Sequence, residues 1–165
     1  MVIIRMGMQE SEKPADSRWA QLVLIGFLSM VFAEAFSGSS ILWFITGWAW
    51  LVTLPLYWSH TLLFLNLAMR SKRTSMGQLY LWGILFGLYE SWVTKVLWAG
   101  YFTDPPLFGT VFGFAIAENI VLLMFWHPVM AFVIPILVFQ ILAKAGSKSN
   151  EGMETAFPTH TSFLQ

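Results

Sequence analysis

The sequence predicts an all-α membrane protein, a polytopic helical bundle of four transmembrane helices with both termini in the cytoplasm. Three observations support this prediction: the composition, the long apolar stretches and the placement of the basic residues. Of the 165 residues, 57% are hydrophobic and 11% are charged, whereas a soluble domain has roughly 25% charged residues. The composition alone therefore indicates that most of the chain lies in a lipid bilayer.

Four apolar stretches are long enough to cross a bilayer, since a spanning helix needs about 20 residues. They cover residues 19–37, 41–69, 78–101 and 109–143. The second contains Pro55 and the fourth contains Pro128 and Pro135, so these two longer helices are expected to be kinked or strongly tilted. The predicted organisation is a cytoplasmic N-terminal segment, a transmembrane domain and a disordered cytoplasmic tail, at residues 1–18, 19–143 and 144–165.

The basic residues give the predicted orientation. With four crossings, the two ends of the chain and the second loop fall on the same side of the membrane. That side receives eight of the nine Lys and Arg residues: Arg5, Lys13, Arg18, Arg70, Lys72, Arg73, Lys144 and Lys148. Because cytoplasmic loops are enriched in Lys and Arg, this side is assigned to the cytoplasm and the bilayer to the cell membrane.

Two alternatives leave the helix count open. His127 and Pro128 would split the fourth stretch into two spans if they formed a tight turn, which would move Lys144 to the outer side. Residues 1–35 would instead be a signal peptide if Ala33-Glu34-Ala35 were a cleavage site of the Ala-x-Ala type. Cleavage would leave three spans with the same loops inside, so the charge pattern does not exclude a signal peptide, whereas it disfavours the tight turn.

Four charged residues lie inside the apolar stretches: Glu34, Glu90, Lys95 and Glu118. A charge at a helix centre costs roughly 2.5–3.5 kcal/mol on insertion scales, so these side chains should face protein or water. Together with His127 they form the predicted buried polar cluster. Such a cluster suits proton transfer, ion coordination or acid–base chemistry, unless its members pair with one another and only fix the helix register.

Small residues recur every fourth position in two of the stretches. Gly83, Gly87 and Ser91 form one such series, and Gly109 and Gly113 begin another. This small-xxx-small spacing lets a second helix backbone approach closely. We therefore expect helix packing at these five positions, either within the bundle or with a partner.

Three segments resemble stretches of uncharacterised multi-pass membrane proteins of prokaryotes. They are AEAFSGSS at residues 33–40, GLYESWVTK at 87–95 and FWHP at 125–128. The resemblance extends over most of the chain from residue 19 to residue 140 and implies a multi-pass membrane protein. That group brings no known activity with it.

A more distant and partial resemblance is to the CAAX-protease and bacteriocin-processing membrane peptidases. Their Glu-Glu-x-x-x-Arg motif is matched here by Glu90, with Ser91 and Lys95 in place of the second Glu and the Arg. His127 falls where the Phe-x-x-x-His motif is expected, although Leu123 replaces its Phe, and the His-x-x-x-Asn motif is missing. The resemblance implies that Glu90 and His127 are the candidate catalytic residues of a degenerate Glu-dependent intramembrane peptidase.

The leading interpretation is an integral membrane protein of unassigned activity with a buried polar cluster around Glu90, Lys95 and Glu118. The alternatives are a small proton-coupled transporter or ion-conducting bundle, the degenerate peptidase, and a membrane scaffold or accessory subunit. The chain has no Cys and no nucleotide-binding or zincin motif, so no cofactor or metal is expected. The expected partners are the lipid bilayer and either a second copy or partner membrane helices; zero net charge gives no reason to expect nucleic acid.

Overall fold

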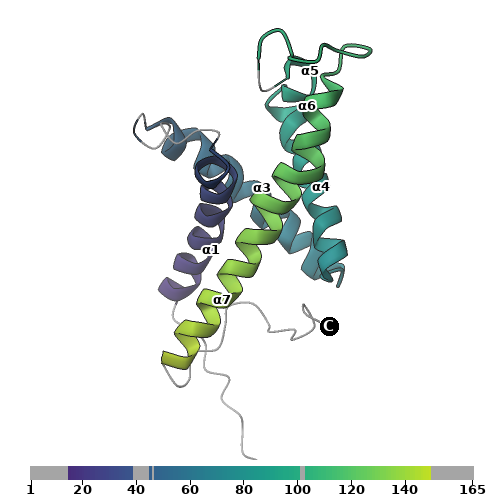
Figure 1. The fold of residues 1–165 in the computed structure, drawn as a ribbon. Coiled ribbons are helices and arrows are strands. Elements are labelled where there is room, and N and C mark those ends of the chain that lie inside the picture. The colour runs from purple at the N-terminus through teal and green to yellow at the C-terminus, as the bar shows by residue number, and fades with distance from the viewer. Residues whose placement is uncertain (1–14, 39–44, 46, 101–102, 150–165) are drawn as a thin grey trace, which may run out of the picture.

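The computed structural model describes residues 15–38, 45, 47–100 and 103–149, and this part of the chain is helical apart from its turns. Within it no strand forms, and one isolated antiparallel bridge joins Val111 to Phe114. The helical elements, shown in Figure 1, are α1 (Ala15–Met30), η1 (Val31–Phe36), η2 (Ala49–Thr53), α3 (Leu54–Arg70), α4 (Met76–Val93), α5 (Val96–Ala99), α6 (Ile116–Val121), η3 (Leu122–Val133) and α7 (Ile134–Ser149). The three η elements are π-helical.

The first helix follows its predicted stretch closely, whereas the second begins at Ala49 instead of residue 41. The α1 helix continues into η1 without a break and ends at Phe36, one residue before the predicted end of the first stretch. The second helix begins at Ala49 as η2 and continues as α3 to Arg70. Pro55 is the second residue of α3, in the first turn, where a missing backbone N–H is tolerated.

The third helix is shorter than predicted. The α4 helix starts after Ser75, whose backbone N–H donates to Gln78 Oε1 at 3.2 Å, an interaction typical of a helix N-terminus. The helix ends at Val93 because Lys95 has a left-handed backbone with a φ of 65°. Only the single turn α5 follows, so the prediction of one helix over 78–101 is wrong beyond residue 93.

The fourth stretch forms one long helix, but it starts later than predicted. Residues 109–115 form a turn rather than a helix, because Gly109, Phe112 and Gly113 have positive φ. From Ile116 to Ser149 the backbone is helical throughout, and Pro128 lies inside the π-helical η3. The alternative of a tight turn at Pro128 is therefore wrong. Pro removes one backbone donor, and the wider π-helical turn tolerates its ring.

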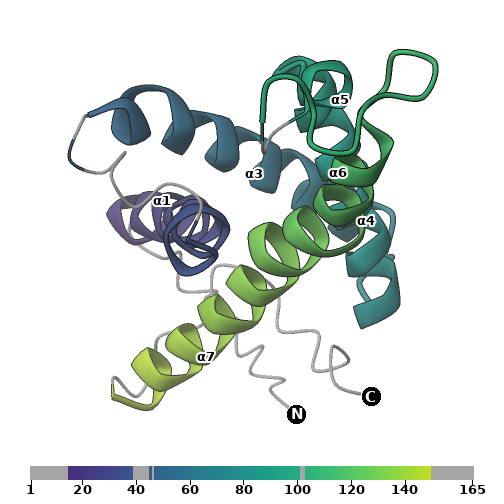
Figure 2. The ribbon, with the colours of Figure 1, turned by 45° about the horizontal axis from the view of Figure 1, so that its top comes forward.

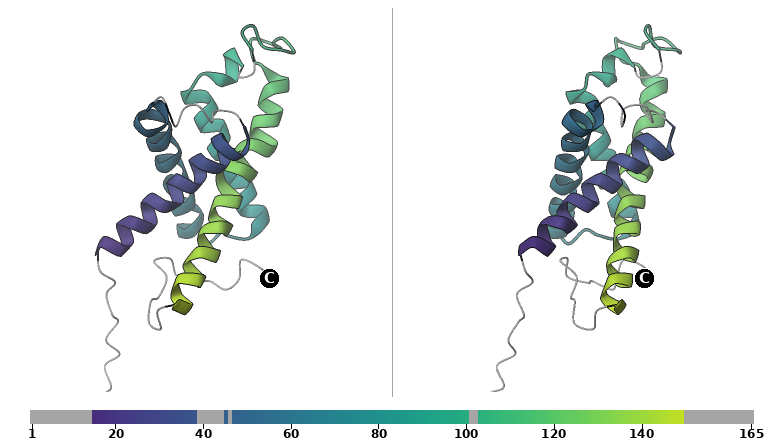
Figure 3. Two further views of the ribbon diagram at one scale, coloured as in Figure 1. Left: turned by 60° about the vertical axis from the view of Figure 1, so that its left-hand side comes forward. Right: turned by 90° about the vertical axis from the view of Figure 1, so that its left-hand side faces the viewer.

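The helices form an antiparallel arrangement in which α4 packs mainly against η3 and α1 packs mainly against α3 and α7. In Figure 1 the start of α1, the α3–α4 connection and the end of α7 lie at the lower end of the molecule. The α5 and α6 elements lie at the opposite end, and both views in Figure 3 agree. Figure 2 shows the α6–η3–α7 helix crossing the others obliquely. The core contains Ile25, Met30, Leu79, Phe86 and Phe132, all at most 1% exposed.

Three helices in the described part of the chain are long and apolar enough to cross a membrane. They are Trp19–Phe36, Trp50–Arg70 and Ile116–Lys144. The α4 helix, which carries Gln78 and Glu90, is not among them. The predicted cytoplasmic segment and the predicted tail lie largely outside the described residues, although α7 continues to Ser149, six residues past the predicted end of the last stretch.

Candidate functional site

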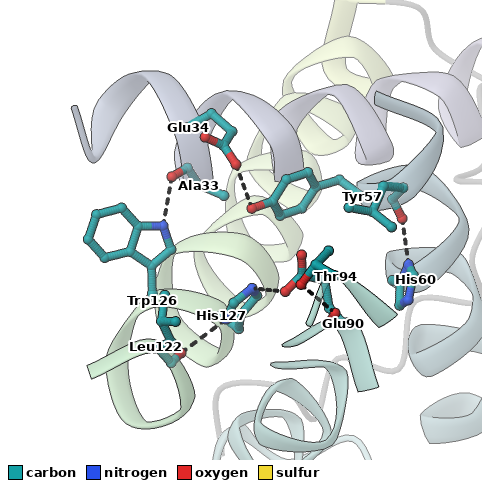
Figure 4. Close-up of polar contacts among 10 residues, drawn as sticks. Ala33, Glu34, Tyr57, His60, Glu90, Thr94, Leu122, Trp126 and His127 are labelled. Carbon is teal, nitrogen blue, oxygen red and sulfur yellow. Dashed lines mark hydrogen bonds and ion pairs between the residues drawn. The ribbon is translucent and has the colours of Figure 1, made fainter. Parts of the chain in front are cut away.

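The centre of the candidate site is a buried contact between Glu90 of α4 and His127 of η3, shown in Figure 4. Glu90 Oε2 lies 2.9 Å from His127 Nε2, and their side chains are 9% and 4% exposed. The other ring nitrogen, His127 Nδ1, lies 3.1 Å from the backbone oxygen of Leu122. Both ring nitrogens of His127 are thus within hydrogen-bonding distance of an oxygen atom, one on α4 and one on η3 itself.

This geometry constrains the hydrogen bonds that the pair can form. A carbonyl oxygen only accepts hydrogen bonds, so His127 Nδ1 must carry a proton and donate it to Leu122 O. A hydrogen bond across the 2.9 Å contact between His127 Nε2 and Glu90 Oε2 requires one proton, bound either to the carboxyl or to the ring. In both forms the pair has no net charge, which is the state that a low-dielectric interior favours.

Two glycines of α4 allow the pair to meet. A Cβ atom on Gly87 would lie 2.9 Å from His127 Cβ, and one on Gly83 would lie 2.5 Å from Pro128 Cα. Any larger residue at these positions would hold α4 away from η3. Gly83 and Gly87 of the predicted packing series therefore face η3 of the same chain, and all three members, Ser91 included, are buried.

A second polar pair lies near the first. The Tyr57 hydroxyl of α3 donates to Glu34 Oε1 of η1 at 2.8 Å, and both residues are buried. Trp126 Nε1 donates to the backbone oxygen of Ala33 at 2.8 Å. Trp126 directly precedes His127 and Ala33 directly precedes Glu34, so this bond holds η3 against η1 beside the two polar pairs. The structure thus brings Glu34, Glu90 and His127 into one region, with each carboxyl group bonded to a different partner.

Phe86 packs between these polar groups. Its ring centroid lies 5.6 Å from that of His127, 6.1 Å from that of Tyr57 and 5.5 Å from that of His60. His60 Nδ1 lies 2.7 Å from the Leu56 backbone oxygen, while the buried His60 Nε2 has no hydrogen-bond partner among the described residues. Sequence reasoning did not place Tyr57 or His60 in the site. The sequence did contain a signal for them: Tyr57, His60 and Phe64 are spaced by three and four residues, which places them on one face of a helix.

Glu118 occupies a different place from the pair. It lies in the first turn of α6, 1% exposed, where its Oε1 accepts a hydrogen bond of 2.8 Å from the Leu107 N–H. Its neighbour Asn119 donates from Nδ2 to the backbone oxygens of Ala115 and Leu97, at 2.8 and 3.2 Å. Glu118 thus holds the turn that precedes α6 instead of facing Glu90.

Two predictions are corrected by the side-chain positions. Lys95 is exposed at the end of α4 and lies outside the buried cluster, because its left-handed backbone ends the helix there. Gly109 and Gly113 do not pack against a helix, since both lie in the turn before α6, where an added Cβ atom would have nothing within 4 Å. Both positions have a positive φ, a backbone conformation that glycine adopts more readily than other residues, and this accounts for glycine there. In the described residues no group of three or more His, Asp or Glu side chains is placed to hold a metal ion.

Comparison with known proteins agrees with the helical architecture. A model of an uncharacterized membrane protein family matches residues 23–161. The chain belongs to this family. It is also similar to an uncharacterized protein of Archaeoglobus fulgidus, with 37% identity over 121 residues, which is 73% of this chain and 37% of that protein. The chain thus spans just over a third of the length of that relative, and no solved structure matches the chain. Neither match shows the resemblance to the CAAX-protease family.

Proposed function

We propose that this membrane protein translocates protons across the bilayer, and that the Glu90–His127 pair carries the proton at the centre of the path. The observation that carries the proposal is the 2.9 Å contact between Glu90 Oε2 and His127 Nε2 in a buried position. The pair shares one titratable proton that moves between carboxyl and imidazole without creating net charge. Groups of this kind are the usual components of intramembrane proton relays.

The surroundings of the pair are compatible with the same proposal. His127 and Pro128 lie in the π-helical segment η3, whose wider turns accommodate the Pro ring beside His127. Among the described residues the pair also lacks a Lys or Arg partner, since Lys95 is exposed at the end of α4. A permanent cation would only pair with Glu90, whereas an imidazole can itself accept a proton and pass it on.

The proposed placement in the cell membrane has four crossings with both termini in the cytoplasm. The α4 helix has 18 residues, a length of about 27 Å at the usual rise, close to a hydrocarbon core of about 30 Å. Arg70, Lys72 and Arg73 belong to the end of α3 and the α3–α4 connection, which lies at the same end of the molecule as the end of α7, the helix that contains Lys144. The positive-inside rule assigns this end to the cytoplasm.

The other hypotheses have weaker support. An intramembrane peptidase would need a water between Glu90 and His127, but the two side chains are in direct contact. A scaffold that binds a partner helix through Gly83 and Gly87 is disfavoured, because η3 of the same chain already covers that face. A second copy or another membrane protein remains an expected partner through other surfaces.

The experiment measures proton flux into liposomes that contain the purified full chain and a pH-sensitive dye, driven by a potassium diffusion potential. The wild-type protein should raise the flux above that of protein-free liposomes. Glu90→Gln should return it to the protein-free level, because an amide can still donate to His127 Nε2 but cannot release a proton. Equal flux with the wild-type protein and with Glu90→Gln would contradict the proposal.

The matched control is Glu118→Gln. This variant makes the same chemical change in a second buried carboxylate, and its amide oxygen can still accept the hydrogen bond from the Leu107 N–H. Because Glu118 lies outside the pair, its substitution should leave the flux unchanged. Loss of flux in both variants would indicate a general effect on the fold.

A further inference from the structure

The turn between α5 and α6 has an unusual conformation for its sequence. Val111 and Phe114 exchange two backbone hydrogen bonds, at 2.9 Å from the N–H of Val111 and 3.0 Å from the N–H of Phe114. The two residues between them, Phe112 and Gly113, have φ of 51° and 83°. Positive φ at both central positions is typical of a type I′ turn, in which Asn-Gly is favoured and an aromatic residue is disfavoured.

The side chains of this turn are apolar and exposed. Phe112 is 96% exposed, Phe108 is 72% exposed and Leu107 is 59% exposed. No charged residue occurs from Pro105 to Ile116. A strained backbone that presents a fully exposed Phe is costly in water, so the side chain requires an apolar environment that the described chain does not supply.

The position of the turn indicates which environment that is. It follows α4 and α5, at the end of the molecule opposite the basic α3–α4 connection. With α4 crossing the hydrocarbon core, this end lies at the outer boundary of the bilayer. Trp98 of α5 packs on Phe114 with ring centroids 5.0 Å apart, and Trp is enriched at membrane interfaces.

We propose that the turn formed by residues 107–114 is an interfacial anchor that inserts Phe108 and Phe112 into the headgroup region of the outer leaflet. The ligand is thus a lipid surface, bound through apolar side chains without charge attraction. The hydrogen bond from Leu107 N–H to Glu118 Oε1 fixes the base of the turn on α6. The anchor therefore holds the outer end of the α6–η3–α7 helix, which carries His127, at a fixed depth.

The test uses the absence of Cys from the chain, which makes any introduced Cys a unique labelling site. A nitroxide spin label is attached to Phe112→Cys in the full chain in liposomes, and its collisions with oxygen and with a water-soluble nickel chelate are compared. Two reference positions calibrate the measurement: Asp104→Cys, on the exposed charged residue of the same loop, and Leu85→Cys, on the exposed face at the middle of α4.

The label at position 112 should show an oxygen-to-nickel collision ratio above that at position 104 and below that at position 85. A ratio equal to that at position 104 would overturn the anchor, because the side chain would then lie in water. Protection from both reagents would also overturn it, in favour of a protein partner. The inference rests on the four-crossing placement in the proposed function, and a water-like ratio at position 85 would show that this placement has failed instead.

A second variant separates insertion from turn geometry. Phe112→Asn favours the same turn and removes the aromatic ring. In this background a label at Phe108→Cys should shift toward the water-like ratio of position 104. An unchanged ratio would show that Phe112 does not hold the turn at the membrane, contrary to the proposal.

Discussion

Replacing Gly83 by Ala should destabilise the protein, because the new methyl group has no room between α4 and η3. An added Cβ would lie 2.5 Å from Pro128 Cα, 2.9 Å from Pro128 Cβ and 3.1 Å from Pro128 O. Ordinary contacts begin near 3.4 Å, so the two helices must separate locally by about 1 Å. None of these three atoms can rotate away, since all belong to a Pro backbone or its ring.

The magnitude follows from two opposing effects. Overpacking of a close interface costs about 1–3 kcal/mol, and a backbone contact that cannot relax falls at the upper end. Replacing Gly by Ala within a helix stabilises by about 1 kcal/mol. The expected net loss is about 2 kcal/mol in the free energy of unfolding, or about 4–8 °C in Tm for a chain of this size.

The assay is thermal unfolding of the purified chain in detergent, followed by helical circular dichroism. The matched control is Gly77→Ala, in the first turn of the same helix, where an added Cβ has nothing within 4 Å. This control should be as stable as the wild-type protein or slightly more stable. If Gly83→Ala unfolds at the wild-type temperature, α4 does not contact Pro128 as described and the reasoning is wrong.

Three further predictions concern single side chains in the same assay. Glu90→Leu should lose about 1–3 kcal/mol, because it leaves His127 Nε2 buried without a partner, whereas Glu90→Gln should stay near the wild-type stability; equal losses would contradict the hydrogen bond. Ser91→Ala should leave stability unchanged or raise it, because the buried Ser91 Oγ has no partner among the described residues, and a clear loss would reveal a bound water. Phe112→Asn should gain about 1 kcal/mol in detergent, since a left-handed residue other than Gly or Asn costs about 1–2 kcal/mol; a loss of stability would show that contacts of the Phe112 ring, with the detergent or with the protein, outweigh the backbone strain.

Much of the fold could be predicted from local properties of the chain. The helix that ends at Phe36 matches its predicted stretch, and the helix that ends at Arg70 matches the end of its stretch although it begins eight residues late, because an apolar run of this length has few alternatives to a helix in lipid. The start of α4 near Gln78 and its series of close-packing glycines were also visible in the spacing. These features depend on neighbours within a few positions along the sequence.

The errors have a common physical cause. The predicted helices over 78–101 and 109–143 both included residues that adopt a left-handed backbone, at Lys95 and at Phe112. Apolar composition does not distinguish a helix from a turn with exposed apolar side chains, so the hydropathy pattern continued through both. The predicted cluster included Lys95 for the same reason: the prediction placed Lys95 inside a membrane helix, whereas α4 ends at Val93.

The sequence by itself determined the class of protein, an α-helical membrane protein, because lipid requires every backbone polar group of a crossing to be satisfied within its own helix. It also supplied Glu90 and His127 as polar residues that must avoid lipid. Only the tertiary structure decided that these two side chains face each other at 2.9 Å, that Tyr57 bonds Glu34, and that Glu118 holds a turn instead. The reason is that partner choice depends on the rotation and depth of one helix relative to another, and the contact of Gly83 and Gly87 with η3 sets both for α4.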